Sequence, residues 1–220
     1  MSVFFEAFRW ILDNANHGGP GAIPARIGEQ LAYTAGAVFV ASIFAVPAGL
    51  YVGHTGRGRE RVIAFSGALR ALPGLGVLIV LALVVGVGFQ APLITLVFLA
   101  VPPLLAGAYA GVESVDRNVV EAARAIGMSP WQVLLKVEVP LGLPLVIAGF
   151  RAGSLQVVAS ATLAFFASGG ALGVYINEGI KTRDYAMMLG ASIIVTTLAV
   201  LIECAFLAAQ WAAARRWSDS

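Results

Sequence analysis

Five long apolar stretches, separated by short polar segments, dominate the chain. They cover approximately residues 28–52, 62–88, 91–111, 141–166 and 187–212. A helix needs about 20 apolar residues to cross the hydrocarbon core of a bilayer, so each stretch is long enough to span a membrane. The runs are continuous rather than alternating, and a backbone exposed to lipid must form its hydrogen bonds within a helix or a closed barrel. The pattern predicts an all-α, polytopic transmembrane protein with about five spans.

Proline and glycine occur within these stretches, as packed membrane helices tolerate. Pro73, Gly74 and Gly76 together predict a break in the second stretch. Two interpretations remain open, because such a break either faces a cavity or eases the packing of neighbouring helices.

The first 16 residues show a different pattern, in which charged residues interrupt apolar ones at helical spacing. The apolar positions are Phe4, Phe5, Phe8, Ile11 and Leu12, and the charged ones are Glu6, Arg9 and Asp13. This pattern predicts an amphipathic helix in the membrane interface with Trp10 at headgroup depth, and the alternative is an unstructured terminus. Residues 17–24 are expected to form a loop, so that 1–26 comprise an interfacial helix and linker.

Composition supports a membrane protein and narrows its chemistry. Apolar residues make up 59% of the 220 residues and charged residues 12%, against roughly a quarter charged in a soluble domain. The net charge of +2 is too small to suggest nucleic-acid binding. Cys204 is the only cysteine, so no disulfide can form within the chain, and with His17 and His54 in loops we expect neither a metal site nor a cofactor.

The distribution of basic residues predicts the orientation, because Lys and Arg favour cytoplasmic loops. Eight lie on one side of the predicted spans and four on the other. The first group is Arg57, Arg59, Arg61, Arg117, Arg124, Lys136, Arg215 and Arg216, and the second is Arg9, Arg26, Lys181 and Arg183. We therefore expect the N-terminus outside and the C-terminus inside, with 27–213 as the transmembrane domain and 214–220 as a cytoplasmic tail.

The only long polar segment between spans, residues 112–140, has the organisation of a helix, a tight turn and a second helix. Asp116 is placed to cap a helix that runs to about Ile126, and Gly127 suits the left-handed residue that ends it. Ser129 is followed by Pro130 and by Gln132, an arrangement that predicts a capping box. A DNA-binding helix-turn-helix is disfavoured, because residues 112–139 carry three basic and four acidic groups.

Within this segment, Glu121, Ala122 and Ala123 are followed after three residues by Gly127, and after nine more by the run 137–140, VEVP. This spacing resembles the EAA loop of ABC-importer permeases, with valines in place of Ile and Leu. The resemblance implies the type I importer (MetI-like) permease fold and a coupling helix that docks on an ATP-binding subunit, with Glu121, Ala122, Ala123, Gly127 and Pro140 as its matching residues. Two adjacent alanines would also leave a shallow helix surface that a partner could approach closely. A surface helix without a partner is the alternative.

The resemblance also implies partners. They are a second permease subunit, identical or paralogous, two ATP-binding subunits and an external substrate-binding protein or lipoprotein, and ATP and Mg would be bound by the ATPase. This chain contains no phosphate-binding loop, since the nearest string, Gly179–Thr182, lacks the upstream glycine. The chain is therefore expected to be a non-catalytic subunit of the plasma membrane. A self-sufficient channel or ion-driven carrier is the rival hypothesis, and an intramembrane enzyme is poorly supported because no catalytic constellation occurs within the spans.

Longer segments narrow the resemblance to permeases of osmoprotectant importers, which carry glycine betaine, choline, carnitine or related compounds. The similar segments begin at Leu69 (LRALPGLGVLIVL), Val101 (VPPLLAGAYAGVESVDRN) and Ser154 (SLQVVASATLAFFASGGALG). Leu105 and Ala106 depart from this pattern, as do Ala167 and Ser168. Methionine-importer permeases share parts of it, so that a methionine or other small-solute permease remains an alternative.

The glycine-rich segment from Ser168 to Asp184 is expected to lie outside. Ser168, Gly169, Gly170 and Gly173 suit a close turn, and Glu178 is the first of four charges that a docking partner could contact. The segment is either an outer gate or binding-protein contact, or an ordinary solvated loop.

Three charged residues fall inside the predicted spans at similar depth, namely Arg70, Arg151 and Glu203. Uncompensated charges within a bilayer are costly. One hypothesis is that Glu203 pairs with Arg151 or Arg70 and holds the helices together. The other is that both arginines extend separately toward the cytoplasm.

Overall fold

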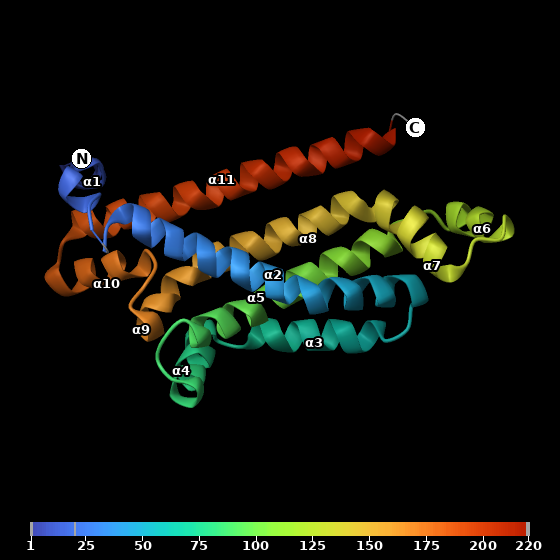
Figure 1. The fold of residues 1–220 in the computed structure, drawn as a ribbon, viewed down its shortest axis with the longest axis horizontal. Coiled ribbons are helices and arrows are strands. Elements are labelled where there is room, and N and C mark those ends of the chain that lie inside the picture. Colours follow the sequence, from blue (N-terminus) through green and yellow to red (C-terminus); the bar gives the residue numbers. More distant parts are fainter. Residues whose placement is uncertain (1, 20, 219–220) are drawn as a thin grey trace. The chain divides into compact units, whose positions relative to one another are not determined.

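All regular secondary structure is helical in the computed structural model of the chain, which describes residues 2–19 and 21–218 (Figure 1). The helices of the first half are α1 Ser2–Leu12, η1 Asn14–Asn16, α2 Ile23–Thr55, α3 Arg59–Ala71, α4 Gly74–Val85 and α5 Gln90–Glu113. Those of the second half are α6 Arg117–Ala125, α7 Pro130–Val133, η2 Leu134–Glu138, α8 Val139–Ser160, η3 Ala161–Ala164, α9 Phe165–Ser168, α10 Gly173–Thr182 and α11 Tyr185–Ser218.

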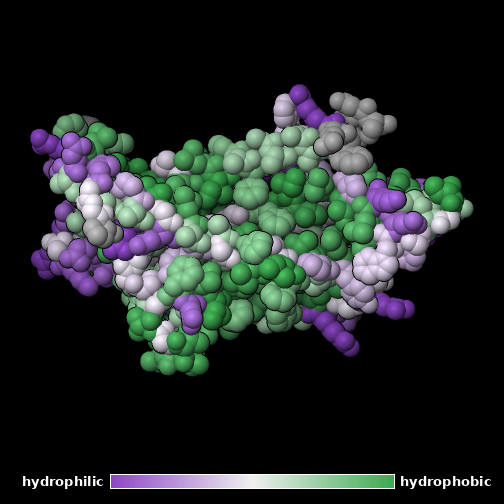
Figure 2. Space-filling model, viewed as in Figure 1, coloured by the Kyte–Doolittle hydropathy of each residue, from purple (hydrophilic) through white to green (hydrophobic). Residues whose placement is uncertain are grey.

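Four helical segments of the described chain are long and apolar enough to cross a membrane, and a bent pair makes a fifth. The four are Ile23–Thr55, Gln90–Glu113, Pro130–Ser168 and Tyr185–Ala213, and the pair is α3 with α4. The all-α prediction with about five spans is confirmed. Figure 2 shows apolar side chains along the visible face of α11, as expected of a helix that faces lipid.

The second predicted span is not straight, since α3 and α4 meet at an angle of 84°. Leu72 is extended, with φ −71° and ψ 128°, and Pro73 follows it at the N-cap of α4. A residue before proline is disfavoured in the helical region, so the helix ends there. The predicted break is therefore confirmed.

Two helices extend into segments that were expected to flank the transmembrane domain. Helix α2 begins at Ile23, inside the expected loop 17–24, because Pro24 is tolerated in a first helical turn, where no amide partner is needed. Helix α11 continues to Ser218 through most of the expected tail 214–220, and residues 219–220 lie outside the described part of the chain.

The chain forms two compact units, each built from three segments. The first contains Met1–Ala37, Pro73–Val97 and Leu155–Leu201, and the second contains Val38–Leu72, Phe98–Ser154 and Ile202–Ser220. Helices α2, α5, α8 and α11 therefore contribute residues to both units.

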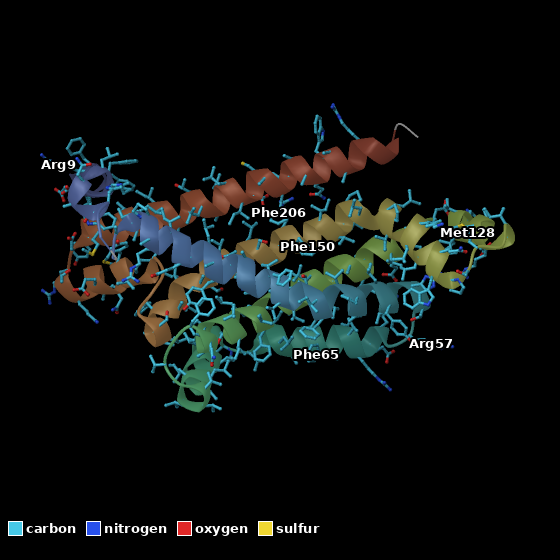
Figure 3. The ribbon with its side chains drawn as sticks, viewed as in Figure 1. Arg9, Arg57, Phe65, Met128, Phe150 and Phe206 are labelled. Atoms are coloured by element: carbon cyan, nitrogen blue, oxygen red, sulfur yellow. The ribbon has the colours of Figure 1, made fainter. Side chains whose placement is uncertain are left out.

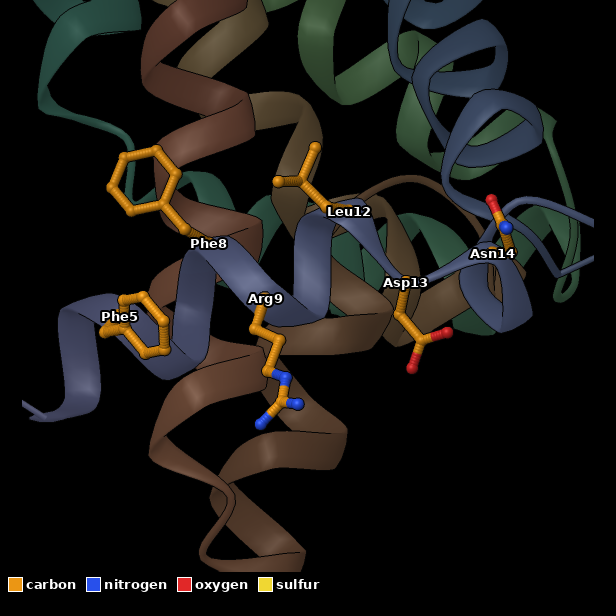
Figure 4. Close-up of a pocket in the computed structure, with 6 residues that line it drawn as sticks. All are labelled: Phe5, Phe8, Arg9, Leu12, Asp13 and Asn14. Atoms are coloured by element: carbon orange, nitrogen blue, oxygen red, sulfur yellow. The ribbon is translucent and has the colours of Figure 1, made fainter.

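In the first unit, α1 is the helix that the terminal pattern predicts. Phe8 and Leu12 project to one side of α1 and Arg9 to the other (Figure 4). Other residues of α1 pack against the rest of the first unit. Ala7 is fully buried, and the Trp10 ring lies against Gly190 and also packs edge to face against the Tyr175 ring, with the ring centroids 5.1 Å apart. Trp10 is thus held by protein packing, while the exposed apolar side chains of α1 remain available to a membrane surface.

In the second unit, α5 and α8 approach so closely that their backbones touch at glycines. A Cβ on Gly142 would lie 2.3 Å from the Gly111 carbonyl oxygen, and one on Gly107 would lie 2.5 Å from the Gly149 Cα. Real Cβ contacts are never this short, so both crossing points require glycine. Small residues at helix contacts are typical of membrane proteins, where dispersion rather than water exclusion drives association.

We predict that Gly142→Ala lowers the stability of the protein, because the new methyl group would have to displace the α5 backbone. Overpacking of this kind costs about 1–3 kcal/mol. The thermal unfolding midpoint in detergent measures the effect. Gly67→Ala is the matched control, since no atom lies within 4 Å of the added Cβ in α3. Equal midpoints for the two variants would contradict the close contact.

Candidate functional site

The segment between α5 and α8 folds as its sequence predicts at both helix starts. Asp116 caps α6, its Oδ1 accepting a hydrogen bond from the Asn118 amide at 2.9 Å, and Gly127 ends this helix with φ +86°. The Ser129 amide donates to Gln132 Oε1 at 2.8 Å and the Gln132 amide donates to Ser129 Oγ at 3.4 Å. The predicted caps and the capping box are confirmed.

Helix α7 continues directly into the next span. The expectation that this span begins at residue 141, after a separate loop helix, is therefore corrected. Helix α7 passes through one π-helical turn, Leu134–Glu138, into α8, so Pro130–Ser168 is a single helical segment. Pro140 has no amide hydrogen and could not bond to the carbonyl four residues earlier. In the π turn the Val139 amide instead donates to the Leu134 carbonyl, and this wider turn admits the proline without breaking the helix.

The two alanines of the motif face different ways, and the expectation that both form an outer surface is wrong. Ala123 is only 7% exposed and packs in a small core with Val115, Val120 and Val133. Glu121 and Ala122 are exposed. Because α6 makes about one turn per 3.6 residues, Ala123 shares the inner face with Val120, three residues earlier, and Ala122 is turned away from it.

The outer surface of α6 and α7 is strongly apolar for a polar connecting segment. Ile126 is 81% exposed and Trp131 65% exposed. Val119 is also an exposed large apolar residue of this surface. Figure 3 labels Met128 in the turn between the two helices. We call Val119, Glu121, Ala122, Ile126 and Trp131 the outer face of α6–α7.

A histidine and a carboxylate join this segment to the end of α2, within the second unit. His54 Nδ1 lies 2.5 Å from Glu138 Oε2, and Glu138 is only 4% exposed. The pair fixes the π turn to α2. This pair was not predicted from the sequence, although a single carboxylate among the mostly apolar residues 133–139 was a usable signal.

The charges within the spans form one pair rather than a cluster of three. Arg151 and Glu203 make two contacts, Nε to Oε2 at 2.7 Å and Nη2 to Oε1 at 2.5 Å. Gln210 accepts a further hydrogen bond from Arg151 Nη1 at 3.5 Å. Arg70, the second-last residue of α3, is exposed and lies outside this pair. Glu203 thus joins α8 to α11 through Arg151.

The segment from Ser168 to Asp184 contains a helix, α10, and is not a solvated loop. Gly169 makes the expected turn with φ +64°. Gly173 does not serve a turn, because a Cβ there would lie 1.8 Å from the Thr162 carbonyl oxygen and the residue is needed for the contact of α10 with η3. Glu178 is exposed on α10, and purple, hydrophilic side chains gather over α1 and α10 in Figure 2.

Polar residues at the start of α2 fasten this turn within the first unit. Glu29 Oε2 accepts hydrogen bonds from the Ala171 amide at 2.7 Å and from Arg26 Nη1 at 2.9 Å. Arg26 Nη1 also donates to the Gly169 carbonyl at 3.0 Å. Gln30 is fully buried, donating to the Val158 carbonyl at 2.6 Å and accepting from the Leu172 amide at 3.2 Å.

Our sequence analysis gave these α2 residues no structural role. Their spacing, i, i+3 and i+4 at the start of an apolar helix, was the available signal.

Tyr175 completes the connection by donating its hydroxyl hydrogen to the Gly21 carbonyl. Burial raises the pKa of the Tyr175 hydroxyl, the nearby Arg26 lowers it and Glu29 raises it. The raised pKa keeps the hydroxyl protonated, and therefore a donor, across the physiological pH range. Within the described residues, no group of three or more His, Cys, Asp or Glu side chains could hold a metal ion.

Sequence and structure comparisons agree on one class of protein. Residues 25–218 match the family described as binding-protein-dependent transport system inner membrane component. The glycine betaine/carnitine/choline transport system permease protein OpuCB of Bacillus subtilis is 34% identical over 183 residues, 83% of this chain and 84% of that protein. The choline transport system permease protein OpuBB of the same organism is 32% identical over 175 residues, 80% of this chain and 81% of that protein.

Among solved structures, a chain of the MetNI methionine ABC transporter in an inward-facing form has a TM-score of 0.74 at 22% identity, covering 85% of this chain and 94% of that chain. This similarity concerns the fold alone. It confirms the predicted MetI-like importer permease fold.

We predict that replacing either Arg151 or Glu203 by Leu destabilises the protein, since each single change leaves a partly buried charge without its partner. Breaking a fully buried pair costs about 3–5 kcal/mol, and the partial exposure of this pair should reduce that loss. The double variant Arg151→Leu/Glu203→Leu should recover most of the thermal stability. Arg70→Leu should change the midpoint little. Single variants as stable as the parent protein would rule out a structural role for the pair.

Proposed function

Because this chain belongs to the family of binding-protein-dependent transport system inner membrane components, we propose that it is the permease subunit of an ATP-driven importer of osmoprotectants. The solutes are small quaternary amines such as glycine betaine, choline or carnitine. The main support is the match to osmoprotectant permeases over about four-fifths of both chains. The chain is a multi-pass protein of the plasma membrane and supplies passage, whereas ATP hydrolysis belongs to a separate subunit.

We assign contact with the ATPase to the outer face of α6–α7. The supporting observation is that large apolar side chains are exposed there on a short, well-capped helix pair with its own small core. A rigid projection that exposes large apolar side chains next to the carboxylate of Glu121 suits a groove on a partner protein. Ala123 and Gly127 contribute to the shape of this projection rather than to the contact itself.

The helix that passes through Pro140 provides the connection from this face to the membrane. When two ATP-binding subunits close, two such permease subunits would be drawn together at their outer faces. Since α7 continues into α8 without a break, displacement of the outer face moves a membrane-spanning helix. This alternates the access of a central pathway between the two sides of the membrane. ATP and Mg are bound by the partner ATPase in this scheme.

Contact with the external binding protein is assigned to α10. Helix α10 presents exposed charges, among them Glu178. The turn at Gly169 and Gly170 is fastened to α2 through Glu29, so a protein docked on α10 could act on the first span directly. The basic residues of the chain favour this side as the outer one.

A methionine importer is the second candidate, and only the similarity of fold to a methionine transporter favours it. At 22% sequence identity, that similarity concerns the fold and does not indicate a shared substrate. The osmoprotectant permeases, in contrast, are 34% and 32% identical to this chain in sequence. A self-sufficient channel or carrier is a weaker candidate, since it gives the outer face of α6–α7 no purpose.

We predict that Glu121→Lys and Ile126→Asp abolish ATP-dependent uptake while the protein still inserts in the membrane. An unpaired charge buried at an interface costs about 2–5 kcal/mol, so uptake should fall at least about tenfold. Uptake of labelled solute and co-purification of the ATPase measure the effect, with immunoblots of membranes as the insertion control. Glu60→Lys reverses an exposed charge on α3 and should transport normally. Full uptake by both test variants would exclude coupling through this face.

We predict that cells with the transporter take up labelled glycine betaine, choline or carnitine, and that deletion of the gene removes this uptake. Methionine uptake should not change. The measurement compares the same strain with and without the gene at raised osmolarity. Loss of methionine uptake with unchanged uptake of all three amines would favour the second candidate.

A further inference from the structure

The second unit contains an apolar groove on three helices with an arginine at one end. The groove has a volume of about 350 Å³. Its lining residues are Phe44, Ala45 and Ala48 of α2, Arg61, Val62 and Phe65 of α3, and Val101 and Leu105 of α5. Every lining residue except Arg61 is apolar.

The groove covers about one turn of each of the three helices. Each helix contributes residues about one turn apart, Phe44 with Ala48, Arg61 with Phe65, and Val101 with Leu105. Leu105 and Ala45 are buried, whereas Phe44 is 69% exposed and Phe65 is 54% exposed. Two exposed aromatic rings therefore stand beside an open depression with a floor of small and branched side chains.

The charged end of the groove lies near the short turn between α2 and α3. Arg61 is the third residue of α3, and Arg57 belongs to the turn itself, which precedes the helix that carries Phe65 (Figure 3). Arg59 is already engaged by Glu113, at 3.1 Å. Among the described residues, Arg57 and Arg61 form no ion pair, and both side chains are exposed.

We propose that this groove binds one acyl chain of an anionic phospholipid, with the lipid phosphate at Arg61 and Arg57. Helices α2 and α5 are membrane-spanning candidates, so the apolar part of the groove faces hydrocarbon. Arg61, at the end of the groove, lies near the turn where α2 leaves the membrane. An arginine next to a membrane surface attracts anionic lipid headgroups with a free energy of about 1 kcal/mol. A zwitterionic lipid could place an acyl chain in the groove, but its headgroup has no net charge to balance the two arginines.

The test uses the full-length chain with its co-purifying subunits in detergent, incubated with equal amounts of phosphatidylglycerol and phosphatidylcholine. Native mass spectrometry counts the lipids that stay bound. We expect preferential retention of phosphatidylglycerol. Arg61→Gln should reduce this preference about fivefold, the factor that corresponds to about 1 kcal/mol for one arginine. Arg70→Gln removes an exposed arginine at the other end of α3 and should leave the preference unchanged.

A second variant tests the apolar part of the site. Ala48→Trp fills the groove and should reduce retention of both lipids, whereas Ala64→Trp adds the same ring to an exposed position of α3 outside it. Equal retention of the two lipids by the parent protein would overturn the proposal. The proposal would also be overturned if Arg61→Gln changed the lipid preference no more than Arg70→Gln does. The same holds if a photo-crosslinker at Phe65 captured a second copy of the chain instead of lipid.

Discussion

The Val139 amide donates to the Leu134 carbonyl, five residues earlier, and this one wide turn allows a helix to pass Pro140 unbroken. Without it, the ring of Pro140 would crowd the Lys136 carbonyl four residues earlier and kink the helix at this point. The capping box at Ser129 starts the helix, and the pair between His54 and Glu138 fixes the π turn to α2. Helix α7, which packs against α6 in their small core, is therefore the end of a membrane helix rather than part of a flexible loop, and coupling depends on this continuity.

Close packing gives that helix a firm support in the second unit. At Gly111 and Gly142 the backbones of α5 and α8 are in contact, so α8 cannot shift along α5 without a clash or a void. Further along α8, Arg151 holds Glu203 of α11 by two short contacts. A glycine contact and an ion pair thus act on the same helix at different points, and together they favour movement of α8 with its neighbours as a body.

Local chemistry made part of this structure predictable. The caps at Asp116 and Ser129, the end of α6 at Gly127 and the bend at Pro73 each depend on a few neighbouring residues, and all were expected correctly. The orientation of Ala123 could not be foreseen in this way, because its burial depends on Val115 and Val133, which fold back on it from either side.

The errors elsewhere have the same physical origin. Arg70 was grouped with Arg151 and Glu203 because the three positions have similar expected depth. Depth does not determine which helices are neighbours, and Glu203 of α11 pairs with Arg151 of α8. For residues 168–184 a solvated loop was one of two open alternatives, since the glycines suggested turns, yet Gly173 serves a helix contact with η3. The polar residues Arg26, Glu29 and Gln30 were given no structural role, because the groups that they bind at Gly169, Ala171 and Val158 lie more than 120 residues away in sequence. The part of the site that sequence alone could not supply is the part made by such distant contacts.

The most direct test of the central claim is the number of solute molecules imported per ATP hydrolysed when the helix is softened at the π turn. Leu135→Gly/Lys136→Gly changes two exposed positions, and each glycine lowers helix stability by about 1 kcal/mol relative to alanine. The matched control is Leu135→Ala/Lys136→Ala. We expect the glycine variant to bind the ATPase and hydrolyse ATP while import per ATP falls well below that of the alanine control. Equal import per ATP in the two variants would contradict transmission through a continuous helix.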